Sequence, residues 1–317
     1  MRVLVTGWAG YIGPVVIRHL RAAGHYVVGI DTGWFLRDYA ELPEYPDEAI
    51  FADIRNAPLV NGIDAVVHLA GLSNDPLGDL DTALTTDINI GGTYSMLAHY
   101  PSARHVVVSS CSVYGTADMA TEETPVAPLT HYAKAKAQID DMVAKYRFDA
   151  VSLRLGTVYG WSPGHRLDLV VNQMVYDAGR GLGVTVNGDA QRPLVHVEDV
   201  ASAIVFMLDR KERGIYNVVG ENWLMADLGA WVAGITKAAL HRHPASADQR
   251  DYSASNAKLR ALGWRPECNV ASTVPSLFAK SRSLRMASRY KRLASIQKLI
   301  REGVLTPDLY RKESVAA

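Results

Sequence analysis

The chain has 317 residues, of which 48% are hydrophobic and 21% charged, so it can bury a sizeable core and is not expected to be disordered. Its 33 Lys and Arg equal its 33 Asp and Glu, and this balance argues against nucleic acid as the main partner, because binding phosphates needs a basic surplus. The two cysteines are too few for a disulfide scaffold, the start of the chain lacks a signal-peptide pattern, and no apolar run reaches the roughly 18 residues of a membrane span. We therefore expect a soluble, cytoplasmic protein with no membrane, nucleic-acid or metal partner, and its length suggests two domains at roughly 100–200 residues each.

Short β-branched runs alternate with amphipathic segments of helix length through the first half of the chain. This alternation predicts βαβ units, and hence an α/β fold whose parallel sheet has helices on both faces. The predicted strands are residues 3–6, 26–30, 65–69, 105–109 and 151–155. The predicted helices between them are residues 11–23, 88–99 and 131–147.

A glycine-rich loop follows the first predicted strand and opens the first predicted helix. Glycines in this position let the backbone turn tightly and let a pyrophosphate approach the main-chain N–H groups at the helix N-terminus. The strand–loop–helix context makes a dinucleotide site a stronger reading than a purely structural turn. The loop residues predicted to bind the cofactor are Gly7, Gly10, Tyr11, Ile12 and Gly13.

Acidic residues follow the next two apolar runs. Asp31 ends the second predicted strand, 18 residues after Gly13. A carboxylate there accepts hydrogen bonds from the adenosine ribose and repels a 2′-phosphate, which favours NAD over NADP. Asp53 and Ile54 follow a third apolar run and are candidates to hold the adenine, with a plain loop or capping role for Asp53 as the alternative.

Tyr132 and Lys136 lie four residues apart in a predicted helix, so both side chains occupy one helical face. A phenol ionises near pH 10, so a base that works near pH 7 needs roughly 4 kcal/mol of interactions that favour the phenolate. We expect the Lys136 ammonium and an oxidised nicotinamide to provide them. The pair follows a Ser-rich strand end at residues 109–112, and this order makes a catalytic role more specific than Tyr-x-x-x-Lys alone.

In the second half of the chain the pattern loosens into loops marked by Pro and Gly. Residues 168–179 and 200–208 are predicted helices, and residues 215–219 are a further predicted strand. A return of that strand to the first sheet would interleave the domains. The predicted division is residues 1–155 plus about 192–218 for the first domain, about 156–191 plus 219–279 for the second, and 280–317 for a basic helical tail.

The tail holds ten Lys and Arg against three Asp and Glu, a local charge of +7 that leaves −7 on the rest of the chain. Leu293, Ile296 and Ile300 are spaced as on one face of a helix. A helix docked on its own domain is the favoured reading, and a subunit-contact or partner-binding tail is the alternative.

The glycine loop, the Ser-rich strand end and the Tyr-x-x-x-Lys pair occur in an order that makes residues 1–279 similar to the extended short-chain dehydrogenase/reductase family. Within this family the chain resembles the nucleotide-sugar epimerases and dehydratases, UDP-glucose 4-epimerases among them. Residues 162–169 and 250–252 are similar to a subgroup that includes GDP-heptose 4-dehydrogenases.

The resemblance implies a Rossmann-type, doubly wound parallel sheet with a smaller, interleaved substrate-binding domain. It also implies that the first domain binds NAD, that the second binds a nucleotide-diphosphate sugar, and that the protein is a homodimer in contact through the helix that carries Tyr132. Further cofactor-binding residues implied by matching segments are Leu69, Ala70, Gly71 and Asn89.

The same resemblance assigns roles in the reaction. Tyr132 would take the proton from the C4 hydroxyl of the sugar while hydride passes to NAD. Ser110 would hydrogen-bond the same oxygen, and Lys136 would bind the nicotinamide ribose and tune Tyr132. The residues expected to contact the substrate diphosphate or its pocket are Arg192 and, with a plain surface role as the alternative, Arg166, Asn172 and Arg250.

Cys111 and Ser112 stand where related 4,6-dehydratases typically have Asp and Glu. Without a carboxylic acid there, dehydration loses its usual general acid. Cys111 is a possible catalytic substitute or a small packed residue behind the nicotinamide, and both readings stay open.

We predict a nucleotide-sugar 4-epimerase that acts by transient C4 oxidation with bound NAD. A 4-dehydrogenase that releases the keto-sugar and NADH is the main alternative, and a 4,6-dehydratase is less favoured. A dinucleotide-binding sensor without catalysis is the alternative from a different class, but it would not need Ser110, Tyr132 and Lys136 together.

Overall fold

Parallel strands form the large sheet of the computed structural model, which describes residues 1–36, 44–145, 148–244, 248–282 and 291–305. Their spatial order is β11 (Gly214–Val218), β7 (Ala150–Leu155), β5 (Arg104–Ser110), β4 (Ala65–His68), β1 (Arg2–Thr6), β2 (Tyr26–Asp31) and β3 (Glu48–Phe51). The chain runs outward from β1 to β3 and then crosses to β4 on the other side of β1. The sheet therefore reverses its order between β1 and β4, and ligands of such sheets bind at the carboxyl ends of the strands at this point.

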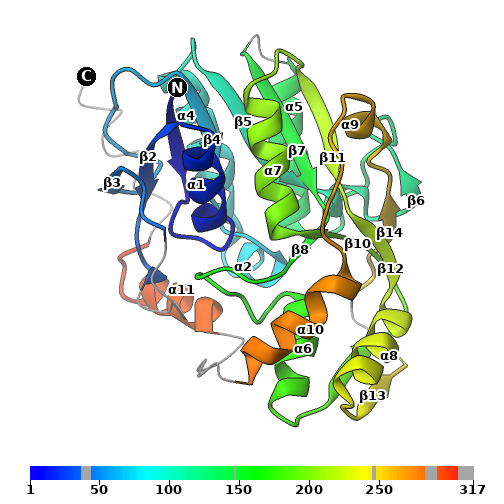
Figure 1. Ribbon diagram of the computed structural model, residues 1–317. Helices are drawn as coiled ribbons and strands as arrows, with labels where there is room; N and C mark the ends of the chain where they lie inside the picture. Colours follow the sequence, from blue (N-terminus) through cyan, green and yellow to red (C-terminus); the bar gives the residue numbers. More distant parts are fainter. Residues whose placement is uncertain (37–43, 146–147, 245–247, 283–290, 306–317) are drawn as a thin grey trace.

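Successive side chains of β1 point to opposite faces of the sheet, and both faces are buried. Val3 and Val5 join the apolar cluster under one pair of helices, while Leu4 joins a cluster on the other face. Figure 1 shows helices on both faces, as the alternation of strands and helices predicts. The covering helices are α1 (Gly13–Ala22) and α7 (Val197–Leu208) on one face and α4 (Gly92–His99) and α5 (His131–Lys145) on the other. The predicted α/β, doubly wound fold is confirmed.

The predicted elements recur with shifted ends. The first helix begins at Gly13 rather than at residue 11, because residues 7–12 form the loop. The predicted helix at 88–99 is interrupted: α3 (Thr82–Thr86) leads into a π-helical turn (Asp87–Gly91) before α4. Of the predicted helix at 131–147, residues 146–147 lie outside the described part of the chain.

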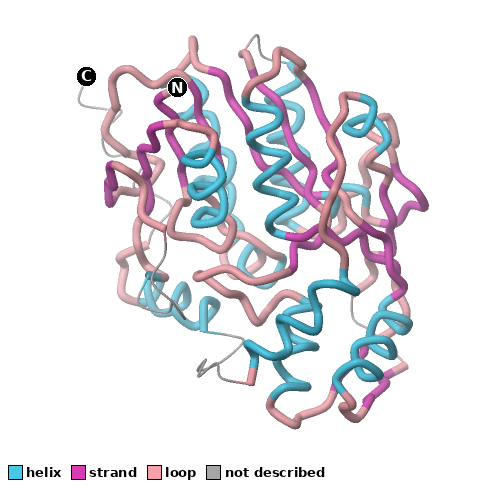
Figure 2. The backbone as a smooth tube through the Cα atoms, in the orientation of Figure 1, coloured by secondary structure: helices cyan, strands magenta, loops and turns pink. Residues whose placement is uncertain are grey.

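The remaining strands form small sheets at the carboxyl edge of the large one. They are β8 (Thr157–Tyr159), β10 (Gln191–His196) and β12 (Glu221–Leu224) in one sheet, β9 (Val184–Asn187) with β13 (Leu240–His243), and β6 (Thr116–Ala120) with β14 (Asp251–Ala254). Figures 1 and 2 show three helices packed together beside these strands, namely α6 (Val170–Gly179), α8 (Met225–Thr236) and α10 (Val270–Ser281). The chain returns to the large sheet with β11, whereas β10 pairs with β8 and β12 and so does not belong to the large sheet.

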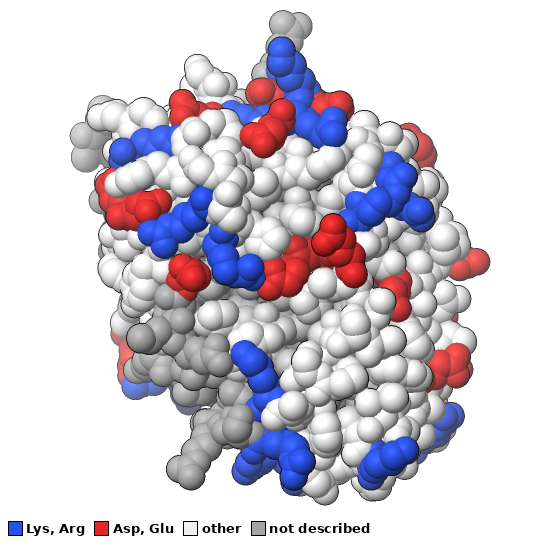
Figure 3. Space-filling model, viewed as in Figure 1, with Lys and Arg blue, Asp and Glu red and all other residues white. Residues whose placement is uncertain are grey.

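The tail forms a further helix, α11 (Lys291–Arg301), which packs against α2 (Asp75–Gly78). Ile296 of α11 is fully buried, so the helix is docked on its own chain, as the favoured reading expected. The side chain of Leu293 and residues 283–290 and 306–317 lie outside the described part of the chain. On the face shown in Figure 3, acidic and basic side chains are intermixed in the upper part, whereas the charged side chains along the lower edge are mostly basic. None of the helices described here is both long and apolar enough to span a membrane.

A buried ion pair anchors α5 to the sheet. The Asp140 carboxylate accepts hydrogen bonds from Arg154 Nε on β7 at 2.7 Å and from Ser152 Oγ at 2.5 Å. The side chains of Arg154 and Asp140 are only 4% and 2% exposed. Arg154 also donates to Tyr114 Oη at 2.9 Å, so the charge is satisfied on two sides.

Replacing Asp140 by Ala leaves the Arg154 charge buried without its carboxylate, and we expect the free energy of unfolding to fall by about 3–5 kcal/mol. The matched control is Asp141→Ala, since the neighbouring Asp141 is 67% exposed and forms a surface ion pair with the exposed Lys145. That change should cost below about 0.5 kcal/mol. Urea unfolding followed by circular dichroism measures both, and equal losses would contradict a structural role for the buried pair.

Candidate active site

A cavity of about 690 Å³ lies at the carboxyl edge of the large sheet, at the reversal between β1 and β4. Its walls come from the loop after β1, the ends of β2, β4 and β5, the start of α5, and residues of the small sheets. Long-range folding thus brings the glycine loop, the Ser-rich strand end and the Tyr-x-x-x-Lys pair to one cavity.

The glycine loop forms one end of the cavity, and two of its glycines pack closely against neighbouring backbone. Gly7 has φ +74°, and a Cβ on it would lie 2.7 Å from the backbone N of Ala70. A Cβ on Gly13 would lie 2.2 Å from the carbonyl oxygen of Trp8. The residues of the loop that line the cavity are Gly7, Gly10, Tyr11, Ile12 and Gly13, all of them predicted.

Asp31 stands at the cavity wall beside this loop. Its carboxylate accepts hydrogen bonds from the backbone N of Ala9 at 3.0 Å and of Gly33 at 2.8 Å. These contacts fix the carboxylate at the end of β2, where an adenosine ribose would lie beside the glycine loop. Backbone approach at the loop and a fixed carboxylate at the strand end together fit a dinucleotide.

The predicted adenine end is more heavily paired than the sequence indicates. Asp53 and Ile54 line the cavity, but the Asp53 carboxylate forms an ion pair at 2.7 Å with the buried guanidinium of Arg55. Arg55 also pairs with Asp87 at 2.7 Å, and nothing in the local pattern pointed to this cluster. An adenine contact of Asp53 remains a prediction.

Of the matching segment after β4, Leu69, Ala70 and Gly71 line the cavity, whereas Asn89 lies behind its wall. The Asn89 side chain accepts from the backbone N of Leu72 at 2.8 Å and donates to its carbonyl at 3.0 Å. Asn89 therefore shapes the loop that borders the cavity, and a direct contact with the cofactor remains a prediction.

Ser110, Tyr132 and Lys136 all border the cavity. Lys136 Nζ donates to the carbonyl of Val108 at 2.7 Å and lies 5.9 Å from the centre of the Tyr132 ring. Ser110 Oγ accepts hydrogen bonds from the N and Oγ of Ser112 at 3.1 and 2.9 Å. The strand end and the helix face thus bring together the predicted catalytic side chains.

The electrostatics of this group differ from the expectation. Burial, reinforced by the negative charge of Asp75, raises the pKa of Tyr132 to about 12, although Arg166, a hydrogen bond from Ser110 and Arg250 oppose the shift. Burial also lowers the pKa of Lys136 to about 8. The expectation that the lysine neighbour makes the phenol acidic does not hold for the protein alone, because burial outweighs the nearby positive charges.

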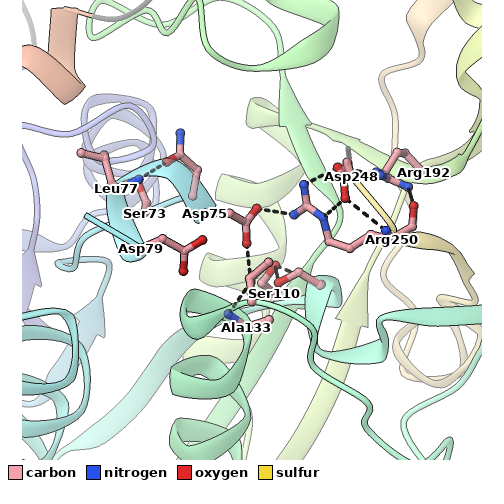
Figure 4. A network of polar contacts seen from close by, with 12 residues as sticks. Ser73, Asp75, Leu77, Asp79, Ser110, Ala133, Arg192, Asp248 and Arg250 are labelled. Atoms are coloured by element: carbon pink, nitrogen blue, oxygen red, sulfur yellow. Dashed lines mark hydrogen bonds and ion pairs between the residues drawn. The ribbon is translucent and has the colours of Figure 1, made fainter. Parts of the chain in front are cut away.

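Arg192 and Arg250 share one carboxylate at the substrate side of the cavity. Asp248 accepts from Arg192 Nη2 at 2.9 Å and from Arg250 Nε and Nη2 at 2.7 and 2.6 Å. A further guanidinium nitrogen of Arg250 reaches Asp75, as Figure 4 shows. Both arginines line the cavity, so the predicted basic residues do come together, each held by an acidic partner.

Arg166 also lines the cavity, but Asn172 does not. Arg166 pairs with Asp168 at 2.5 Å and donates to Ser73 Oγ at 2.6 Å. Asn172 is fully buried, and its amide donates to Tyr11 Oη and to the Arg166 carbonyl, both at 3.1 Å. Asn172 thus positions two lining residues, and nothing in its surroundings supports a direct substrate contact.

Cys111 points away from the cavity and is fully buried. Its Sγ donates to the carbonyl of Arg154 at 3.3 Å and packs in a cluster with Val219 and Tyr252, and burial strongly raises the pKa of the thiol. The turn after β5 directs Cys111 into the core, so the structure supports the packed reading rather than a catalytic one.

Asp75 is the main feature of the cavity that the sequence reasoning missed. Its carboxylate accepts from Thr130 Oγ1 at 2.5 Å, and Thr130 Oγ1 in turn accepts from the backbone N of Ala133 at the start of α5. Figure 4 shows Asp75 between Arg250 and α5. A usable signal existed, because the polar run of residues 73–75 closely follows a predicted strand end.

The family model described as the NAD dependent epimerase/dehydratase family matches residues 3–219. The dTDP-glucose 4,6-dehydratase 1 of Escherichia coli K12 is 27% identical to this chain, with 84% of this chain and 89% of the relative covered. Both comparisons extend well beyond the glycine loop and include the Ser-rich strand end and the Tyr-x-x-x-Lys pair.

The solved structures similar to this chain include enzymes that catalyse different reactions. The UDP-glucose 4-epimerase of Thermus thermophilus in complex with NAD gives a TM-score of 0.76 at 27% identity, covering 89% of this chain and 99% of that chain. The dTDP-glucose 4,6-dehydratase DesIV of Streptomyces venezuelae, also with NAD bound, gives 0.77 at 27% identity, covering 89% and 97%.

Gly7→Ala tests the dinucleotide end of the cavity. The added Cβ strains a left-handed backbone and meets Ala70, so we expect NAD affinity to fall by about tenfold or more. Gly24→Ala is the matched control, since Gly24 has a similar φ of +78° with nothing within 4 Å. Calorimetric titration with NAD measures both variants, and equal NAD affinities would show that the loop does not hold the dinucleotide.

Proposed function

The chain belongs to the NAD-dependent epimerase/dehydratase family, and from this premise we propose that it is a nucleotide-sugar 4-epimerase acting by transient oxidation of the sugar at C4. The family predicted from the motifs is confirmed, and with it NAD as the cofactor. The observation that carries the proposal is that one cavity brings together the glycine loop, the trio of Ser110, Tyr132 and Lys136, and the arginines of the substrate side.

NAD would be held by the glycine loop and by Asp31, and when bound it supplies the hydride acceptor and a positive charge near the reacting carbon. The site fits this group because the backbone of the glycine loop lines the cavity, and because the Asp31 carboxylate is fixed beside it. Lys136, anchored on the Val108 carbonyl, is placed to bind a ribose hydroxyl with its remaining donors.

Tyr132 is the proposed proton acceptor for the C4 hydroxyl. Ser110 hydrogen-bonds the phenol and favours its ionised form, and Arg166 and Arg250 act in the same direction. Since the pKa of Tyr132 is about 12 in the protein alone, the base becomes effective only when further positive charge enters the site. After the keto-sugar has turned and hydride has returned to the opposite face of C4, the same oxygen would give back the proton, which completes an epimerisation.

The substrate diphosphate would bind Arg192 and Arg250. Guanidinium groups can bind phosphate oxygens in a bidentate manner, as Arg250 binds the Asp248 carboxylate here. Substrate binding would then exchange one anionic partner for another without leaving either arginine unpaired.

The relatives include both 4-epimerases and 4,6-dehydratases, and the residues after β5 favour the former. Cys111 and Ser112 supply no carboxylic acid for elimination, and Cys111 is buried away from the cavity. The second candidate is an NAD-dependent 4-dehydrogenase, which would use the same residues. The similarity of residues 162–169 and 250–252 to a subgroup that includes GDP-heptose 4-dehydrogenases favours it.

The products distinguish these reactions. Incubation with UDP-, GDP- and dTDP-sugars followed by chromatography and mass spectrometry should give a new isomer of unchanged mass. Loss of two hydrogens would instead identify a dehydrogenase, and loss of water a dehydratase.

Tyr132→Phe should lower turnover by about 10²-fold or more while NAD still binds, and activity within tenfold of the wild type would refute Tyr132 as the base.

The pH dependence tests the surroundings of the phenol. The charged groups facing Tyr132 are Lys136 on its own helix, Asp75 on α2, and Arg166 and Arg250. Asp75→Asn removes the negative charge that raises the pKa of Tyr132. Because the phenolate is the active form, the acidic limb of the kcat profile should move to lower pH by about one unit.

Asp79→Asn is the control for this change. Asp79 lies next to the end of α2 and accepts from the backbone N of His131 at 3.3 Å, but it is not among the charges that shift Tyr132. Its pH profile should match the wild type. Superimposable profiles for both variants would remove Asp75 from the account of the base.

A further inference from the structure

The tail helix α11 contributes to the wall of the cavity. Ile296 lies in the tail, beyond residues 3–219 that match the family model, yet it borders the cavity that contains the glycine loop and Asp31. Its side chain is fully buried. Figure 1 shows α11 below β2 and β3. The helix also contacts α2, which lies in the segment after β4.

The apolar cluster that contains Ile296 includes residues from two walls of the cavity. Leu72 and Leu77 belong to the segment after β4, whereas Trp34 and Phe35 follow β2. All four line the cavity, and all four belong to the same apolar cluster as Ile296. Ile296 thus shares one apolar cluster with residues from two walls of the cavity.

The two faces of α11 differ in the way a docked helix requires. Ile296 is buried and Leu299 and Ile300 are partly buried, whereas Gln297 and Lys298 are exposed. Leu305, just after the helix, is only 1% exposed and joins the same cluster. The attachment therefore includes apolar contacts at two points along the chain.

We infer that α11 is the outer wall of the dinucleotide site and retains NAD, so that the cofactor exchanges only when this helix detaches. The inference rests on the proposed cofactor site and goes beyond the proposed reaction, because it concerns cofactor exchange and assigns a binding role to the tail. A retained cofactor suits a reaction in which hydride returns to the same substrate molecule.

The test measures the exchange of bound NAD in the full chain. Wild type, Ile296→Asp, Ile296→Ala and Gln297→Asp are loaded with radiolabelled NAD and chased with excess unlabelled NAD, and the retained label is followed by rapid filtration. A charge at position 296 cannot remain in the apolar cluster, so Ile296→Asp should exchange NAD about tenfold faster or more. Ile296→Ala should give a smaller acceleration, and Gln297→Asp, which adds the same charge on the exposed side, should exchange at the wild-type rate.

The outcomes separate this inference from the proposed function. Equal exchange rates in all four proteins, each with NAD bound, would overturn the role of α11 and leave the proposed reaction intact. Failure of the wild type to bind NAD would overturn both. Circular dichroism checks that each variant is folded. If Ile296→Asp does not fold, the exchange rate of Ile296→Ala still decides the test.

Discussion

The position of the Tyr132 phenol, half-buried in the wall of the cavity, is the constraint on which the rest of the site depends. Burial raises its pKa to about 12 and lowers that of Lys136 to about 8, so the helix face that carries both residues does not by itself create a base. Ionisation of a buried phenol needs compensating positive charge or hydrogen bonds to the phenolate. In this structure Ser110, Arg166 and Arg250 favour the phenolate, and a positively charged nicotinamide would add to their effect. The base is thus a property of the assembled cavity rather than of the Tyr-x-x-x-Lys pair.

Every arginine of the substrate side has a carboxylate partner, and this follows from the cost of burying charge. Arg166 is paired with Asp168, and Asp248 binds both other arginines. An unpaired buried guanidinium would destabilise the fold, whereas a paired one can exchange its carboxylate for a phosphate. Asp75 adds a connection, since it contacts both an arginine of this group and Thr130 at the start of the catalytic helix. The proposed phosphate-binding and proton-transfer parts of the site are therefore joined by one carboxylate.

Local patterns predicted the parts of the structure that depend on neighbours in sequence. Strand positions, the glycine loop and the shared helical face of Tyr132 and Lys136 follow from periodicity and backbone chemistry, and the structure contains all of them. Side-chain direction at strand ends did not follow, because one turn after β5 decides that Ser110 faces the cavity and Cys111 the core. Asp75 was missed for a related reason, because it contacts Arg250, which is far away in the sequence. Asp248 lies two residues from Arg250, but the contact that joins it to Arg192 is also long-range and could not be predicted from local spacing.

The two halves of the cavity have different walls, and the difference matches the demands of an enzyme that keeps its cofactor and releases its substrate. Around Ile296 the wall is apolar, and opening it exposes hydrocarbon to water, which makes detachment costly. On the proposed substrate side the wall consists of ion pairs, and an incoming diphosphate would replace carboxylate oxygens on Arg192 and Arg250 with phosphate oxygens. Because similar hydrogen bonds form and break, that exchange has a small net free energy and is readily reversed. Slow exchange of the cofactor and rapid exchange of the substrate can thus coexist in a single cavity. The cofactor end is lined by apolar contacts that are costly to open, whereas the substrate end is lined by ion pairs that can be replaced by others.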